Sequence, residues 1–228
     1  MTFFQIFRTI FVLPFAWISA IMVRSKPLDK RYLKIQKWSI FIIRYLGYHL
    51  EVSGVENIPK EGPIYFVSNH QGTLDPALVV ASCPVPTAFI SKRKNLKLPV
   101  FGSWAKTIDV IHFDADTRMG NIAMLREATR RLKAGRNLLV FPEGTRSKGD
   151  AMNPFKEGAL QPAYMGKATI VPITLNNAYC IDDKKDKHKI LSITYGKAFR
   201  YENYKVYTHK ECSDMLYEEI DKCIKKGF

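Results

Sequence analysis

The chain has few cysteines, and their arrangement excludes the two structures that cysteines most often build. The four thiols lie far apart, without paired spacing: Cys83, Cys180, Cys212 and Cys223. We therefore expect neither a disulfide framework nor a zinc knuckle, and we interpret the thiols as reduced cysteines of a cytosolic domain. Internal repeats and low-complexity segments are also absent, and the composition excludes disorder, collagen and coiled coil.

Acidic residues are scarce relative to basic ones. The 228 residues include 35 Lys and Arg against 21 Asp and Glu, which gives a net charge of +14. Such an excess indicates an acidic partner, which is a nucleic acid, an anionic membrane surface or an acidic protein. No RNA-binding aromatic pattern or helix-turn-helix signature is present, so nucleic acid ranks last among the three.

Only one long hydrophobic run occurs, over residues 3–23, which excludes a polytopic membrane protein. Arg8 and Pro14 interrupt this run, whose length approaches that needed to cross a bilayer. Five basic residues follow it: Arg24, Lys26, Lys30, Arg31 and Lys34. We expect a membrane-anchoring helix that either lies in the interface or spans the bilayer, with the basic cluster and the domain that follows on the cytoplasmic side.

A second helix is predicted over residues 35–50. An apolar stripe recurs along it at three- and four-residue spacing: Ile35, Trp38, Ile42, Tyr45 and Leu46. This stripe either packs on the globular domain or lies on the membrane beside the first helix. We therefore divide the chain into membrane-associated helices at residues 1–50 and a single domain at residues 51–228.

The domain alternates strand-like and helix-like segments. Apolar runs of strand length occur at residues 63–68, 87–91, 108–113, 137–141, 169–175 and 190–196, and amphipathic helices are predicted over 119–134 and 211–226. Gly135 follows the first of these helices as a left-handed cap residue would. The pattern predicts an α/β fold with a mixed, largely parallel sheet flanked by helices.

The loop after the strand at residues 63–68 contains His70 and, five positions later, Asp75. A histidine can exchange a proton near neutral pH, and a carboxylate across a tight turn can fix its tautomer. Because Pro76 follows Asp75, this aspartate also suits the N-cap of a helix, and the two roles are compatible. The same spacing occurs at His209 and Asp214, where it marks an ordinary helix start.

A second loop follows the strand at residues 137–141. Gly144 permits close backbone approach, Thr145 offers a hydroxyl, and Arg146 offers a guanidinium suited to phosphate. Ligands of open α/β sheets gather at the carboxyl ends of strands, where both loops are expected to meet. Between the two loops, residues 92–97 carry four cations, which either bind an anionic group or form a solvated basic loop.

Four segments resemble the sequence blocks of the glycerolipid acyltransferases, in particular the bacterial 1-acylglycerol-3-phosphate acyltransferases. In chain order they read NHQGTLD (69–75), LPVFG (98–102), FPEGTRS (141–147) and IVPITL (170–175). The resemblance covers residues 52–196. It implies transfer of a fatty acyl group from a thioester, on acyl carrier protein or coenzyme A, to the sn-2 hydroxyl of 1-acylglycerol-3-phosphate, giving phosphatidate for phospholipid biosynthesis.

The resemblance also implies roles for individual residues. His70 resembles the general base and Asp75 its orienting partner, while Glu143, Gly144, Thr145 and Arg146 resemble the acceptor-binding block, with Arg146 on the phosphate. Val171 and Pro172 match the fourth block, which shapes the site. The Arg that the family carries after the strand at 108–111 is missing here, and the substitutes are Arg118, Lys92 and Arg93. The absence of this Arg bears on which acceptor headgroup the chain prefers, including whether that headgroup is a bare phosphate.

The chemistry implied by the resemblance needs no metal or other cofactor, because a thioester is already activated and requires only a base and donors for the oxyanion. We therefore expect a lysophospholipid acceptor, an acyl carrier protein or acyl-CoA donor, and an anionic membrane surface as partners. The alternatives are acylation of glycerol-3-phosphate or of another lysophospholipid. A different class of function is a non-catalytic basic protein that binds lipid or nucleic acid.

Overall fold

A computed structural model describes residues 3–183 and 188–226. Its centre is a seven-stranded sheet in the order β1-β7-β6-β2-β5-β3-β4. The strands are β1 (His49–Ser53), β2 (Ile64–Ser68), β3 (Thr87–Lys92), β4 (Ile111–Phe113), β5 (Asn137–Val140), β6 (Thr169–Asn176) and β7 (Ile190–Tyr195). All neighbours pair in parallel except β6 and β7, which are antiparallel. The mixed, largely parallel sheet that we predicted is therefore confirmed.

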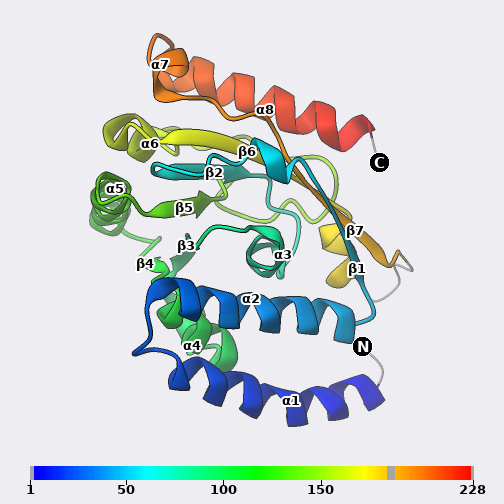
Figure 1. Ribbon diagram of the computed structural model, residues 1–228. Helices are drawn as coiled ribbons and strands as arrows, with labels where there is room; N and C mark the ends of the chain where they lie inside the picture. The colour runs from blue at the N-terminus through cyan, green and yellow to red at the C-terminus, as the bar shows by residue number, and fades with distance from the viewer. Residues whose placement is uncertain (1–2, 184–187, 227–228) are drawn as a thin grey trace.

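Helices cover both faces of this sheet (Figure 1). The α-helices are α1 (Phe3–Met22), α2 (Leu28–Tyr45), α3 (Asp75–Ser82), α4 (Pro99–Thr107), α5 (Arg118–Lys133), α6 (Gln161–Gly166), α7 (Tyr201–Tyr204) and α8 (His209–Lys226). Short 3₁₀ turns are η1 (Val55–Asn57), η2 (Arg93–Lys97) and η3 (Ala178–Ile181). The predicted helices at 119–134 and 211–226 correspond to α5 and α8, and Gly135 has the left-handed φ of +76° expected of a cap.

The central strand β2 contributes side chains to two hydrophobic cores. Its side chains alternate between the faces, as the pleat requires, and all five residues are buried. Phe66 packs in the core under α2 and α3, whereas Tyr65 and Val67 pack in the core under α5, α6 and α8. A strand buried on both faces explains why this segment is a continuous apolar run rather than an alternating one.

The predicted helix over residues 35–50 begins and ends earlier, as α2. Its last turn closes with a hydrogen bond of 3.1 Å from the Tyr48 N–H to the Ile43 carbonyl, and Gly47 between them has φ +83°. This C-terminal motif stops the helix and lets the chain enter β1 at His49. Of the two interpretations of its apolar stripe, packing holds for Ile35, which lies in the core, whereas the other isoleucine of α2 in that core, Ile43, was not part of the predicted stripe.

The first helix also packs on the domain. The Trp104 Nε1–H of α4 donates to the Ala16 carbonyl at 3.2 Å, and Arg24 Nη2 donates to Ser103 Oγ at 2.9 Å. Figure 1 shows α1 at one end of the molecule, outside α2 and α4. Among the described residues, no helix combines the length and the apolar character that crossing a bilayer requires. The membrane-anchoring role expected for α1 therefore stays a prediction.

Three helices were absent from the sequence-based expectation, namely α4, α6 and α7, and so was strand β1. The longest of the three, α4, begins at Pro99, because proline is well suited to the first turn of a helix. The predicted strand at 108–113 is correspondingly shorter, since residue 108 ends α4 and β4 covers only Ile111–Phe113.

Candidate active site

The two loops singled out in the sequence lie side by side. Their strands, β2 and β5, are adjacent and parallel, so both loops leave the same edge of the sheet. The Ser147 backbone N–H donates to the His70 carbonyl at 2.7 Å, and the Ser147 hydroxyl donates to the same oxygen at 3.2 Å. The expectation that the loops meet at the carboxyl ends of the strands is confirmed.

His70 and Asp75 form a hydrogen-bonded pair. The His70 Nδ1 lies 2.7 Å from Asp75 Oδ2, and Asp75 is fully buried. The Gly72 backbone N–H also points at this carboxylate, at 3.0 Å from Oδ1 and 2.9 Å from Oδ2. Burial raises the pKa of Asp75, and the hydrogen bonds from His70 and Gly72 act in the opposite direction because they favour the ionised form.

The expected N-cap role of Asp75 is wrong. The helix α3 begins at Asp75 itself, and the residue in the N-cap position is Leu74, without a side-chain cap. The reason is that the Asp75 carboxylate turns back toward the preceding loop, where it meets Gly72 and His70. The carboxylate thus contacts His70 and the Gly72 backbone rather than the N–H groups of α3.

The His70 imidazole is held from a second direction. The Phe141 ring stacks on it with centroids 4.3 Å apart and an interplanar angle of 23°. An ionised Asp75 accepts from Nδ1–H, which assigns the proton to Nδ1 and leaves Nε2 as an acceptor. No described residue hydrogen-bonds to Nε2, and the His70 side chain is 20% exposed. The arrangement can therefore take a proton from a molecule that approaches from solvent.

Glu143 connects the two loops from below the surface. It is 2% exposed, and its Oε1 accepts from the His70 backbone N–H at 2.6 Å. Its Oε2 accepts from the Asn153 backbone N–H at 2.8 Å and from Asn153 Nδ2 at 2.9 Å. Burial raises the pKa of Glu143, and these N–H donors oppose that rise. Oε1 thus holds the backbone at His70, and Oε2 ties the same carboxylate to Asn153.

Arg146 extends over the first loop. Its Nη1 contacts the Thr73 hydroxyl and lies 3.3 Å from Asp182 Oδ2. Asp182 also accepts from the Thr73 backbone N–H at 2.8 Å. The preceding Gly144 has φ +68°, a left-handed conformation that suits glycine, and Thr145 is exposed. The guanidinium, 42% exposed, is therefore tethered beside the loop that carries His70.

The remaining cations of the prediction lie farther along the sheet. Lys92 ends β3 and pairs in register with Phe113 of β4, and Arg118 begins α5, where it is exposed. Strand β5 separates β3 from β2. Within residues 3–183 and 188–226, no hydrogen bond or ion pair joins Lys92 or Arg118 to the histidine loop, and their part in binding stays a prediction.

Several residues that position the site were not foreseen. Asn69, fully buried, clamps the loop to β6, since its Nδ2 donates to the Leu175 carbonyl at 2.9 Å and its Oδ1 accepts from the Leu175 N–H at 2.8 Å. Gln71 Oε1 accepts from the Ala178 N–H at 3.0 Å. Asn69 and Gln71 flank His70, and such polar neighbours were a sign in the sequence that side chains hold this loop in place. Asn153 and Asp182 offered none, because folding alone brings them to the loops.

Comparisons with known proteins agree with this geometry. The sequence model of the Acyltransferase family matches residues 49–176. A 1-acyl-sn-glycerol-3-phosphate acyltransferase of Borreliella burgdorferi is 28% identical over 160 residues, which are 70% of this chain and 59% of that protein. The human 1-acyl-sn-glycerol-3-phosphate acyltransferase alpha is 32% identical over 157 residues, 68% of this chain and 56% of its own length. The chain thus spans little more than half of these relatives.

A solved structure shares the fold. The crystal structure of the 1-acyl-sn-glycerophosphate acyltransferase PlsC from Thermotoga maritima superimposes with a TM-score of 0.76 over 97% of both chains, at 21% sequence identity. The matching family model extends over more than half of the chain and includes both loops that meet at His70. On this evidence the chain belongs to the Acyltransferase family.

Proposed function

We propose that this chain transfers a fatty acyl group from an acyl thioester to the sn-2 hydroxyl of 1-acylglycerol-3-phosphate, which yields phosphatidate. The observation that carries the proposal is the contact of 2.7 Å between His70 Nδ1 and an Asp75 carboxylate with no exposure to solvent. Membership of the Acyltransferase family and the names of the relatives support the same reaction.

In the proposed mechanism, His70 Nε2 accepts the proton of the acceptor hydroxyl while the hydroxyl oxygen attacks the thioester carbonyl. Asp75 keeps the Nδ1 proton in place and stabilises the imidazolium that forms. When the tetrahedral intermediate collapses, the carbon–sulfur bond breaks and the imidazolium returns its proton to the leaving thiol. A thioester is activated enough for direct attack, so neither a cofactor nor an acyl-enzyme is required.

Arg146 is the proposed partner of the acceptor phosphate, because its planar guanidinium offers several N–H donors to phosphate oxygens. Gly144 supplies the turn that brings Arg146 to the histidine loop, and the exposed Thr145 hydroxyl lies next to it. Glu143 contributes by holding the His70 backbone. Lys92 or Arg118 replaces the arginine that the family carries after the strand at 108–111 and that this chain lacks.

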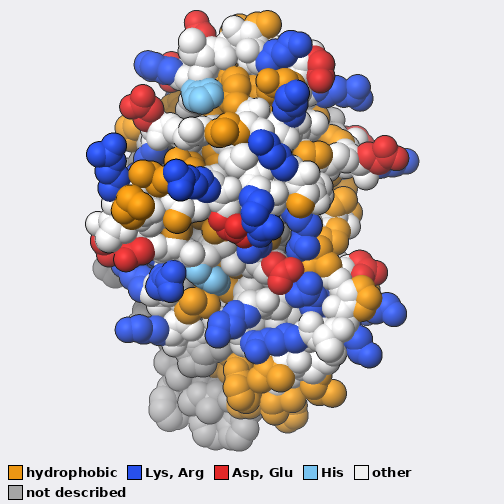
Figure 2. Space-filling model, turned by 90° about the vertical axis from the view of Figure 1, so that its left-hand side faces the viewer, with side chains coloured by type: hydrophobic (Ala, Val, Ile, Leu, Met, Phe, Trp, Pro, Cys, Tyr) orange, Lys and Arg blue, Asp and Glu red, His pale blue; other side chains and the backbone are white. Residues whose placement is uncertain are grey.

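The proposed setting is the cytoplasmic face of a membrane. Large apolar side chains of α1 are exposed, as at Phe15 (68%) and Met22 (71%). Figure 2 shows hydrophobic side chains gathered at the lower end of the molecule, with Lys and Arg side chains close to them. Lys26 and Lys30 are exposed just after α1, where each adds roughly 1 kcal/mol of attraction to anionic headgroups. The basic surface also suits an acidic acyl carrier protein, with acyl-CoA as the other possible donor.

An acyl-transfer assay with purified protein, an acyl thioester and lysophosphatidate tests the proposal. We expect His70→Ala to lower kcat on the order of 10² to 10⁴-fold, as loss of a general base does. His209→Ala is the matched control, because His209 also precedes an aspartate by five residues but lies at the start of α8. Full activity of His70→Ala, or no acyl transfer by the unmodified chain to lysophosphatidate, contradicts the proposal.

The acceptor headgroup is tested in the same assay. Arg146→Ala is expected to raise KM for lysophosphatidate while KM for the thioester stays unchanged, and Arg118→Ala and Lys92→Ala measure the contribution of the other cations. Glycerol-3-phosphate and a lysophospholipid with an esterified phosphate serve as competing acceptors. Unchanged acceptor KM in all three variants rules out the proposed phosphate contacts.

A further inference from the structure

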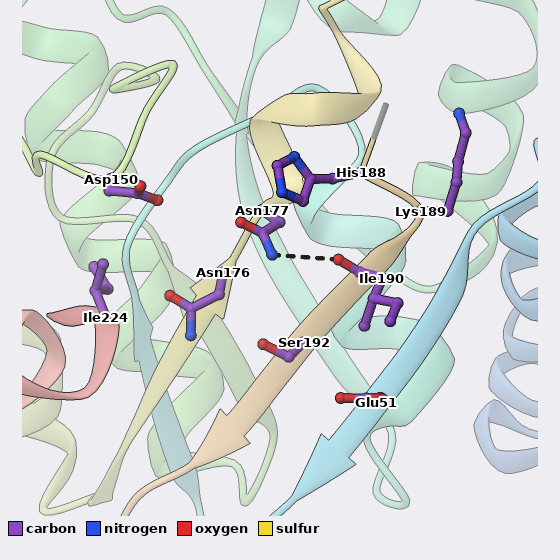
Figure 3. A pocket seen from close by; sticks show the side chains of 9 residues that line it. All are labelled: Glu51, Asp150, Asn176, Asn177, His188, Lys189, Ile190, Ser192 and Ile224. Atoms are coloured by element: carbon purple, nitrogen blue, oxygen red, sulfur yellow. Dashed lines mark hydrogen bonds between the residues drawn. The ribbon is translucent and has the colours of Figure 1, made fainter. Parts of the chain in front are cut away.

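A row of polar side chains crosses one face of the sheet away from His70. Asn176 of β6 pairs in register with Ser192 of β7, and Ser192 pairs in turn with Glu51 of β1. Residues paired in register point to the same face, so the three side chains stand next to one another (Figure 3). They line a pocket of about 550 Å³ whose wall also includes Ile190 and Ile224.

Asn176 is the strongest sign that this pocket receives a ligand. The residue is 7% exposed, and its buried Nδ2 has no hydrogen-bond partner among the described residues. Buried amide N–H groups are almost always paired, because an unpaired group loses its hydrogen bonds to water on burial and gains none in exchange. The pocket therefore presents a donor that a hydrogen-bond acceptor can satisfy.

The charge of the pocket is opposite to that of the chain. Glu51 forms no ion pair with a described residue. Asp150, on the other side of the pocket, accepts long hydrogen bonds from Gln71 at 3.3 Å and from Tyr179 at 3.4 Å. Among the described residues of the lining, the lysine is Lys189, whose ammonium lies over the Tyr48 ring, 4.5 Å from the centroid. Carboxylates thus face the interior in a chain of net charge +14.

We propose that this pocket binds a hydroxylated aliphatic amine, such as an amino sugar. Its ammonium group pairs with Glu51, a hydroxyl accepts from Asn176 Nδ2, and Ser192 bridges between them. The outer residues of the row, Glu51 and Asn176, are two strand spacings, or about 10 Å, apart. Because their side chains cover part of this distance, a compact amino polyol can span the rest. Ile190 and Ile224 supply apolar contact for its carbon atoms.

A metal ion is the less suitable occupant. Within the part of the chain that the structure describes, no group of three or more His, Cys, Asp or Glu side chains is arranged to hold one. The pocket lies on the α8 face of the sheet, whereas α3, which follows His70, packs under the opposite face. The hydrogen bond from Gln71 to Asp150 connects the pocket to the histidine loop, but the proposal concerns binding alone and is tested without acyl transfer.

Calorimetric titration of the full chain with D-glucosamine tests this site. Glucose, which lacks the ammonium group, and butylamine, which lacks hydroxyls, are the matched probes. We expect saturable binding of glucosamine that is tighter than that of either probe. Glu51→Gln keeps the shape of the pocket but removes the charge, and we expect it to weaken glucosamine binding about tenfold or more.

Glu56→Gln is the control, because Glu56 is exposed in η1 and does not line the pocket. Ser192→Ala, which removes the bridging hydroxyl, replaces Glu51→Gln if that variant fails to fold by circular dichroism. The proposal is overturned if the unmodified chain shows no saturable binding or if glucose binds as tightly as glucosamine. It is also overturned if the pocket substitution leaves binding unchanged, or if the Glu56 control weakens it equally.

Discussion

Replacing Glu143 by glutamine tests how the site is held in place. The Glu143 carboxylate accepts three hydrogen bonds, from the His70 N–H at 2.6 Å and from the backbone and side-chain N–H groups of Asn153 at 2.8 and 2.9 Å. Glutamine has one oxygen and one NH₂ group. Whichever way its amide is turned, an N–H group faces another N–H group, so at least one buried donor loses its acceptor.

The magnitude follows from these contacts. An unsatisfied buried donor costs about 1–3 kcal/mol, partly offset because glutamine carries no charge to bury. We expect the free energy of unfolding to fall by about 1–3 kcal/mol, which corresponds to roughly 2–12 °C in Tm for a chain of this size. If the NH₂ group turns toward His70, the catalytic imidazole moves with its backbone, and a displacement near 1 Å lowers kcat by about 10²-fold.

Differential scanning fluorimetry and the acyl-transfer assay measure the two effects on the same preparation. Glu157→Gln is the control, because Glu157 is exposed in the same loop. A loss of kcat with little change in acceptor KM is the signature of a positioning residue. Unchanged Tm and kcat in Glu143→Gln refute the reasoning, since they show that the buried hydrogen bonds contribute neither to stability nor to the orientation of His70.

Two further predictions concern stability. Gly54→Ala is expected to lower the free energy of unfolding by at least about 1 kcal/mol, because Gly54 has a φ of +72° and an added Cβ would lie 2.0 Å from the Tyr195 carbonyl oxygen. Denaturant titration measures this loss, and an unchanged unfolding midpoint contradicts the prediction. Burial raises the pKa of Glu219. Its ionisation therefore costs stability as pH rises through the folded-state pKa, and Glu219→Gln is expected to gain a few tenths of a kcal/mol at pH 7 but nothing below about pH 4. An equal gain at both pH values refutes this.

Six of the seven strands were predictable because each is a short apolar run bounded by turn residues, whereas β1 was not expected because polar residues, His49 and Glu51, alternate with its apolar ones. All six expected runs contain a strand, and the long amphipathic pattern of α5 located that helix within one residue at each end. The misses have physical reasons. Helix α4 was hidden by Pro99 and Gly102, and α2 was displaced because its end depends on the hydrogen bond between Tyr48 and Ile43 rather than on its apolar stripe.

The site was predictable where its residues are close in sequence. His70 and Asp75 share one loop, so the spacing and the strand before it suggested their pairing, which the distance of 2.7 Å confirms. The capping role of Asp75 was wrong, because sequence does not show which way a carboxylate turns. Asn153 and Asp182 were missed, since each reaches the loops only through the fold.

The sequence by itself determined the α/β class, the two loops and the excess of positive charge, because all three depend on local periodicity, turn chemistry and composition. The tertiary structure decided that β2 and β5 are neighbours, and that buried Glu143 ties their loops together. It also aligned Asn176 and Ser192, from consecutive strands, with Glu51, which is distant from both in sequence. Strand order and register arise from long-range packing, which leaves no local trace in the chain.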